Sequence, residues 1–113
     1  MIDTRNPDGP MGGPALVAGA TRDFTITNGC GVPATAQVIS INVTITQPTA
    51  TGQLVLYASG TANPNTATID YSAGQTRANN AVLLPNAGGV ITVQCVQSSG
   101  TVDFILDVNG YFQ

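Results

Sequence analysis

The ionisable side chains of this 113-residue sequence limit the chemistry that it can perform. Those that are charged at neutral pH are six Asp and three Arg, and the chain contains no Glu, Lys or His. Without His the commonest general base is missing, and without Lys there is no Schiff-base nucleophile. Most enzyme mechanisms are therefore excluded, and hydrolysis would rest on Asp alone. We predict that the protein is not an enzyme and uses no cofactor.

Asp103 and Asp107 form the best candidate for a catalytic pair. Both fall on one face of the predicted last strand, with Ile105 between them. At about 3.4 Å rise per residue their carboxylates stand roughly 13–14 Å apart, beyond the roughly 5–9.5 Å of paired glycosidase carboxylates. A working pair would have to recruit another Asp, such as Asp3 or Asp70. We expect a solvated or Arg-paired acidic face.

The N-terminal residues Asp3, Thr4 and Arg5 offer a second polar group. If this segment runs beside the last strand, Arg5 can pair with Asp107 as a structural clamp, because guanidinium groups bind carboxylates in a bidentate way. A calcium site from Asp3, Asp8 and Asp107 is the alternative, although the spacing does not resemble an EF-hand. We expect the clamp and predict no metal site.

Polar loop residues in the second half of the chain are the candidates for ligand binding. Planar amides and one guanidinium can hydrogen-bond sugar hydroxyls, and a tyrosine ring can pack on the face of a sugar. The alternative is structural, because Asn also tolerates left-handed turns and caps its own backbone. The candidate residues are Tyr57, Asn63, Asn65, Tyr71, Arg77, Asn79 and Asn80.

The chain has two cysteines, Cys30 and Cys95, and no CxxC pair. Without His they cannot complete a zinc site of thiolate and imidazole ligands, so a disulfide is favoured over metal. It would close a loop of about 65 residues, worth on the order of 4 kcal/mol, and it indicates an oxidising compartment. Two buried free thiols are the alternative.

Charge and hydropathy exclude two classes of partner. The net charge of −3 and the pI near 4.1 argue against nucleic acid, since phosphate neutralisation needs clustered Lys or Arg. No run approaches the roughly 18–20 apolar residues of a membrane span, so we predict no membrane insertion.

Alternating apolar residues predict strands separated by Gly, Pro and Asn turns, with no helical stripe. The segment from Asn6 to Ala20 is too rich in Pro and Gly for a helix and is predicted as an ordered loop around an apolar plug. Residues 72–80 are predicted as a polar loop. The pattern predicts one domain over 1–113, an all-β antiparallel β-sandwich of seven or eight strands, jelly-roll or immunoglobulin-like. The predicted strands are 21–27, 36–46, 53–58, 67–71, 81–84, 90–96 and 101–108.

Several segments resemble a module that is repeated in large exported bacterial surface proteins. They are IDTRNPDGPMGGPALVAGATRDFTI at the start, CGVPATAQ, INVTITQPTATGQLVLYASG and AGQTRANNAV in the middle, and DVNGYF at the end. The resemblance covers nearly the whole chain. It implies a β-architecture and a secreted or cell-surface location, and it supplies no ligand and no reaction.

Two functions fit these observations. The first is a non-catalytic structural or adhesive module of a bacterial surface or secreted protein, whose polar strand faces pack against copies of itself or against a surface polymer. The second is a carbohydrate-binding module or lectin, which the Asn, Thr and Tyr residues favour, although the chain has three Tyr and no Trp.

Overall fold

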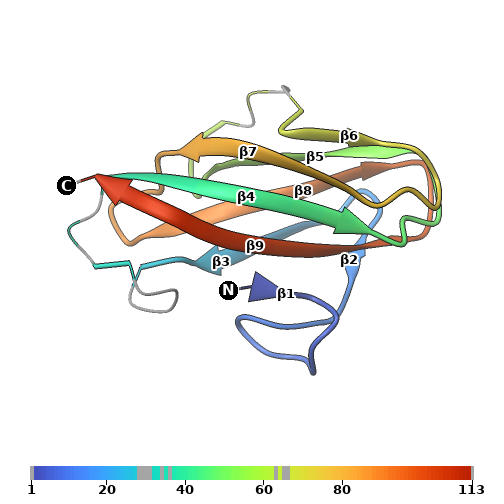
Figure 1. Ribbon diagram of the computed structural model, residues 1–113, viewed down its shortest axis with the longest axis horizontal. Coiled ribbons are helices and arrows are strands. Elements are labelled where there is room, and N and C mark those ends of the chain that lie inside the picture. The colour runs from blue at the N-terminus through green and yellow to red at the C-terminus, as the bar shows by residue number, and fades with distance from the viewer. Residues whose placement is uncertain are drawn as a thin grey trace.

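The computed structural model describes residues 2–27, 32, 33, 35, 37–62, 64 and 67–112. These residues form nine β-strands and no helix (Figure 1). The strands are β1 (Ile2–Asp3), β2 (Leu16–Val17), β3 (Thr21–Thr25), β4 (Val38–Thr46), β5 (Gly52–Ala58), β6 (Ile69–Tyr71), β7 (Arg77–Leu83), β8 (Val90–Gln97) and β9 (Thr101–Phe112).

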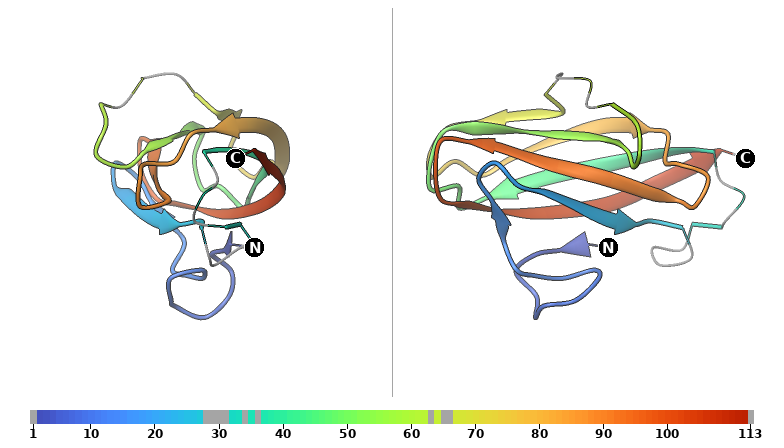
Figure 2. Two further views of the ribbon diagram at one scale, coloured as in Figure 1. Left: turned by 90° about the vertical axis from the view of Figure 1, so that its left-hand side faces the viewer. Right: turned by 180° about the vertical axis from the view of Figure 1, so that it is seen from behind.

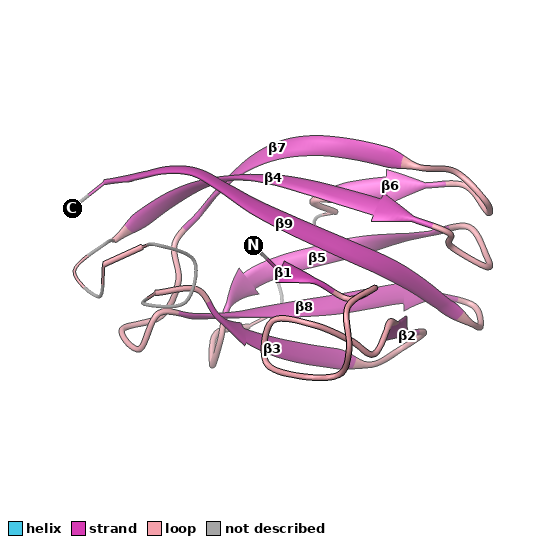
Figure 3. Cartoon of the chain, turned by 60° about the horizontal axis from the view of Figure 1, so that its bottom comes forward, coloured by secondary structure: helices cyan, strands magenta, loops and turns pink. Residues whose placement is uncertain are grey.

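The strands make two antiparallel sheets that lie face to face (Figure 2, Figure 3). One sheet has the order β1-β9-β4-β7, with β2 also paired to β9, and the other has the order β3-β8-β5-β6. If β1 and β2 are counted as one interrupted strand beside β9, this is the eight-strand order of a jelly roll. An immunoglobulin sandwich divides its strands differently. The β-sandwich prediction is confirmed, and the strand order decides between its two forms.

The inner face of the first sheet follows the alternation of β4. Ile39, Ile41, Val43 and Ile45 are fully buried, while the residues between them face outward and are partly exposed. The side chains of a strand alternate between its two faces, because successive Cβ atoms point in opposite directions. The alternating sequence therefore produces this division. The buried residues of β9, including Phe104 and Leu106, lie opposite Ile45 and Val43 on the same inner face.

The second sheet closes the core from the other side. Leu54, Val55 and Leu56 of β5 are all buried, as expected for a strand that lies between β8 and β6. Phe24 of β3 meets Phe104 across the two sheets, with ring centroids 5.6 Å apart. This tilted pair joins the sheets at the centre of one hydrophobic cluster.

The predicted polar loop over 72–80 is wrong in its second half, since β7 begins at Arg77. Arg77 pairs with Ile45 and Asn80 with Asn42, so β4 provides a ladder along the whole of β7. Asn has a low β propensity, but here cross-strand pairing at an exposed edge outweighs it. Most residues of β7 are exposed, so its polar side chains remain in contact with water.

The N-terminal segment also differs from the prediction. It remains mostly a loop that projects from the sandwich (Figure 1), yet two short stretches pair with β9. These two strands bring the number within the described residues to nine instead of seven or eight. Leu16 is buried and forms the predicted apolar plug. At the other end β9 continues to Phe112, past a bulge at which Ser40 pairs with Gly110 and Ile41 with Val108.

Candidate functional site

The described surface carries an open groove of about 560 Å³ beside β5 and β6. Gly52 pairs with Tyr71 at its floor, and Gln53 pairs with Asp70. A side chain at position 52 would collide with Gln97 and with the Val96 carbonyl, so glycine permits the close approach of β5 to β8 beside the groove. The polar residues of its lining are Thr51, Gln53, Asp70, Ser72, Gln75 and Arg77.

Tyr71 and Arg77 are the two predicted ligand residues that line this groove. Tyr71 is only 3% exposed, and its hydroxyl donates to Gln97 Oε1. Burial raises the pKa of Tyr71, so the phenol stays protonated. Because its ring is covered, Tyr71 supports the floor of the groove and does not offer a face for a sugar to stack on.

The other predicted ligand residues do not join the groove. Asn79 donates from Nδ2 to the Thr68 carbonyl, and Asn80 lies opposite Asn42 on the outer face of the first sheet. Tyr57 pairs with Thr92, on the side of β5 that faces away from the core. Asn63 and Asn65 lie outside the described residues.

Arg77 differs from the other two arginines in how its guanidinium is used. Arg5 forms a bidentate pair with Asp3, and Arg22 donates to four backbone carbonyls. Arg77 makes one hydrogen bond, from NH1 to the Asp70 carbonyl at 3.0 Å. Nε and NH2 of Arg77 have no partner within the described part of the chain, so this guanidinium can bind an external acceptor.

Sequence reasoning missed the groove residues that precede β5 and follow β6. Thr51, Ser72 and Gln75 occupy turns, and nothing in their spacing marks a site. The antiparallel pairing of QLVLYA with IDY would have brought Gln53 opposite Asp70, so that pairing is the signal that could have found them.

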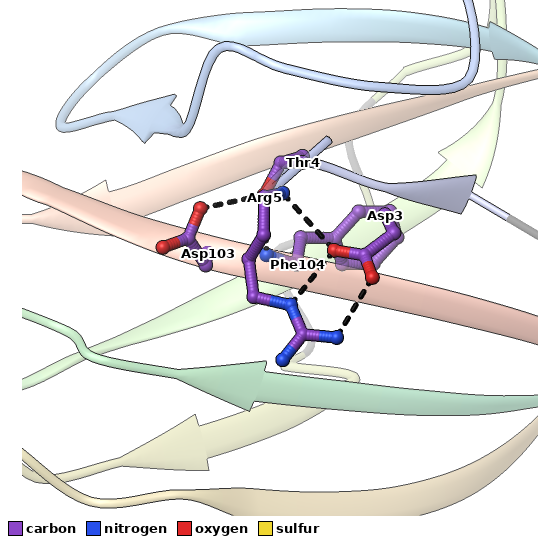
Figure 4. A network of polar contacts seen from close by, with 5 residues as sticks. All are labelled: Asp3, Thr4, Arg5, Asp103 and Phe104. Atoms are coloured by element: carbon purple, nitrogen blue, oxygen red, sulfur yellow. Dashed lines mark hydrogen bonds and ion pairs between the residues drawn. The ribbon is translucent and has the colours of Figure 1, made fainter. Parts of the chain in front are cut away.

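A second polar group lies where β1 meets β9 (Figure 4). Arg5 donates from Nε and NH2 to the two carboxylate oxygens of Asp3, at 2.9 and 2.8 Å. Thr4 Oγ1 donates to Asp103 Oδ1 at 2.9 Å and accepts from the Phe104 backbone N–H at 2.8 Å. Each polar group has a partner, so the network holds the N-terminal segment on β9.

The predicted clamp between Arg5 and Asp107 is therefore corrected. The segment does run beside the last strand, but Arg5 binds Asp3, which is nearer in sequence, and Asp107 lies opposite Asn42 of β4. Arg5 follows β1, and the antiparallel register of Ile2 with Leu106 and Asp3 with Ile105 places Asp107 beyond the other end of β1. The carboxylate of Asp3 is engaged by the guanidinium, and the described residues contain no group of three or more His, Cys, Asp or Glu suited to a metal.

Acid should weaken this network. The hydrogen bonds from Arg5 hold the pKa of Asp3 below its ordinary value of 3.8. A carboxyl group whose pKa is lower in the folded than in the unfolded protein stabilises the fold fully at a pH above its unfolded pKa. This stabilisation is lost as the pH falls through the pKa of the folded state. We expect the thermal midpoint of the wild type to fall more steeply between about pH 5 and about pH 2 than that of Asp3→Asn. Asp107→Asn is the control and should keep the wild-type slope; equal slopes for wild type and Asp3→Asn would contradict the prediction.

Cys95 is a buried free thiol in β8, and its predicted disulfide partner Cys30 lies outside the described residues. Burial raises the pKa of the Cys95 thiol. Because Cys30 is not among the described residues, the disulfide stays a prediction.

Thiol labelling separates the two possibilities. Alkylation of the denatured, unreduced protein, followed by intact-mass measurement, should add no label if the disulfide forms in oxidising conditions, and two labels if both thiols are free. In either case we expect Cys95 to be unreactive in the folded state, because its thiol is buried and protonated. Rapid labelling of Cys95 in the native protein would contradict this expectation.

Exposed apolar residues gather at one end of the first sheet. We call Val82, Leu84, Tyr111 and Phe112 the apolar end. Val82 is 61% exposed, Leu84 63% and Phe112 64%. Val82 and Gly110 both pair with Ser40 of β4, and Phe112 pairs with Val38. Four of the six exposed large apolar side chains of the described residues therefore lie at this end of the sheet. Val82 and Phe112 point to its outer face, while Tyr111, which pairs with the buried Ile39, points to the other side.

The sequence matches no protein-family model and no curated protein. Within the described residues, no helix is long and apolar enough to cross a membrane. The fold and the surface define a jelly-roll sandwich that carries an open polar groove and a separate apolar end.

Proposed function

We propose that this chain is a non-catalytic structural and adhesive module of a bacterial surface or secreted protein, and that it associates with copies of itself. The apolar end is the observation that carries the proposal, since small monomeric proteins rarely leave large apolar side chains grouped on their surface. The resemblance to exported surface modules and the absence of His and Lys support the location and the lack of catalysis.

The edge of β7 supports self-association as well. Among the described strands β7 pairs only with β4, so its other edge presents backbone N–H and C=O groups. Proteins often protect such edges with Lys or Pro, and β7 has neither. Two copies that pair along β7 would bring Val82 of each copy into the contact.

Light scattering coupled to size-exclusion chromatography tests the proposal. We expect the wild type to show a mass that rises with concentration, and the double variant Val82→Thr with Phe112→Ser to remain a monomer. Val17→Thr is the matched control, because Val17 is also exposed but lies on β2, outside the apolar end. A wild type that is strictly monomeric at high concentration would remove the assembly part of the proposal.

A second function, carbohydrate binding, rests on the groove. It combines hydroxyl, amide and guanidinium groups around a partly apolar floor, the mixture that ligand sites use to orient polar molecules. A glycan array at high protein density, with and without calcium, tests it. Binding that Arg77→Ala abolishes would support this function, and the absence of binding to any glycan would count against it.

A further inference from the structure

We propose that the groove beside β5 and β6 binds the carboxylate of an acidic saccharide, such as a uronic acid unit, and that Arg77 is the residue that recognises it. This inference rests on the second proposed function, carbohydrate binding, and adds the chemical class of the ligand. It is independent of self-association through the apolar end.

The first step of the argument is the state of the three arginines. Two guanidinium groups are engaged by the protein itself: Arg5 forms an ion pair with Asp3, and Arg22 donates to four carbonyls. Arg77 lies on the rim of the groove with one hydrogen bond to a carbonyl, and within the described residues it forms no ion pair. A guanidinium presents its donors in a planar fork, which matches the two oxygens of a carboxylate.

The position of Arg77 follows from the fold. It is the first residue of β7, an edge strand, and its partner Ile45 faces the core. At the edge of the sandwich the side chain reaches across the opening between the two sheets to Asp70 on β6. Asn79 makes the same crossing to Thr68 two residues further on. Arg77 is thereby held at the groove by its bond to the Asp70 carbonyl.

The second step concerns the neighbouring polar groups, which retain donors. Gln75 Oε1 accepts from the Ser72 backbone N–H, which leaves the Nε2 donors of Gln75 for a ligand. Thr51 Oγ1 accepts from the Ala73 backbone N–H, and its own hydroxyl proton remains available. These donors suit the ring and hydroxyl oxygens of a sugar, and the Asp70 carboxylate, which also lines the groove, can accept from sugar hydroxyls.

The third step excludes more highly charged anions. Arg77 is one cation beside the carboxylate of Asp70, on a chain with a net charge of −3. A phosphate or nucleic acid backbone needs several cations. One guanidinium flanked by hydroxyl and amide groups fits a ligand with one negative charge and many hydroxyls for each unit, which describes a uronic acid.

Amide chemical shifts of the full chain, measured by NMR, test the inference. The probes are glucuronate, a galacturonic acid trimer, and the methyl ester of that trimer, which keeps the hydroxyls and removes the charge. We expect the acidic trimer to shift the amides of residues 51–53 and 70–77. We expect the ester to bind at least roughly tenfold more weakly, which is about 1.4 kcal/mol. Added salt should lower the affinity for the acidic trimer, because salt screens the attraction between exposed charges.

Variants assign the binding to Arg77. Arg77→Ala should lose roughly tenfold or more in affinity for the acidic trimer. Arg77→Lys should recover only part of it, since Lys keeps the charge but not the fork. Asn80→Ala is the matched control on the same strand and should bind like the wild type, because Asn80 lies on the outer face of the sheet. The spectra of the free variants show whether each one is folded.

Three outcomes would overturn the inference. If the trimer and its ester bind with equal affinity, the protein binds carbohydrate but does not recognise the carboxylate. Shifts confined to other surfaces would remove the groove. If none of the three probes changes any amide chemical shift, acidic saccharides are not ligands of this protein. The light-scattering result for the apolar end does not depend on this outcome.

Discussion

We expect Phe104→Ala to lower the free energy of unfolding by about 3–5 kcal/mol, a large share of the roughly 5–15 kcal/mol of a domain of this size. Phe104 is fully buried in the first half of β9 and packs against Phe24 of the opposite sheet. Truncation removes the ring that joins the two sheets and leaves a cavity between them. Chemical denaturation monitored by circular dichroism measures the change.

Asp103→Asn is the control for Phe104→Ala on the adjacent residue. Asp103 accepts one hydrogen bond, from Thr4 Oγ1, and the amide oxygen of Asn can also accept it. We expect a change within about 0.5 kcal/mol, the range of surface substitutions. An unfolding midpoint of Phe104→Ala equal to that of the wild type would show that β9 does not lie in the core, and the sandwich described above would then be incorrect.

The second large effect is expected at Arg22. Its NH1 donates to the Pro14 carbonyl at 2.7 Å, and its NH2 lies within 3.0 Å of the carbonyls of Gly9, Gly12 and Gly13. The guanidinium carbon also lies 4.8 Å from the ring centre of Phe24. Arg22→Ala removes four hydrogen bonds to the N-terminal loop and leaves the carbonyl of the buried Gly12 without a donor, whereas those of Gly9 and Gly13 keep backbone donors. We expect it to lower the free energy of unfolding by roughly 2–4 kcal/mol.

Hydrogen exchange locates the effect of Arg22→Ala. The amides of Gly9, Gly12 and Gly13 donate to carbonyls within the N-terminal loop, and they should exchange faster once the guanidinium no longer holds the loop together. Arg77→Ala is the matched control, because it removes the same side chain with one carbonyl bond. Unchanged exchange in the loop of Arg22→Ala would show that the loop is stable without the arginine.

The interior of the sandwich follows closely from the alternation of the sequence. In β4 every second residue from Ile39 to Ile45 is apolar, and each of these side chains is buried. The apolar run of β5 likewise places that strand inside its sheet. Such segments are predictable because burying one large side chain is worth about 1.5–3 kcal/mol, and only one orientation of the strand buries the apolar set.

The candidate site was predictable only in part. Tyr71 and Arg77 do share a groove, but Tyr71 is buried beneath it, and Asn79 and Asn80 point to other partners. The start of β7 at Arg77 was hidden, because its polar residues resemble a loop and gain their order from β4, more than thirty positions earlier in the chain. Local propensity carries no information about such a distant partner.

The amino-acid sequence by itself determined the all-β class, the inward face of each long strand, and a set of charged side chains limited to Asp and Arg, since these depend on composition and on a period of two residues. Only the tertiary structure decided the jelly-roll order, the partner of each arginine and the grouping of the apolar end. Arg5 binds Asp3, Arg22 binds loop carbonyls and Arg77 remains open, although all three are the same residue type. The physical reason is that a polar side chain takes whichever acceptors the packing of distant strands brings within about 3 Å.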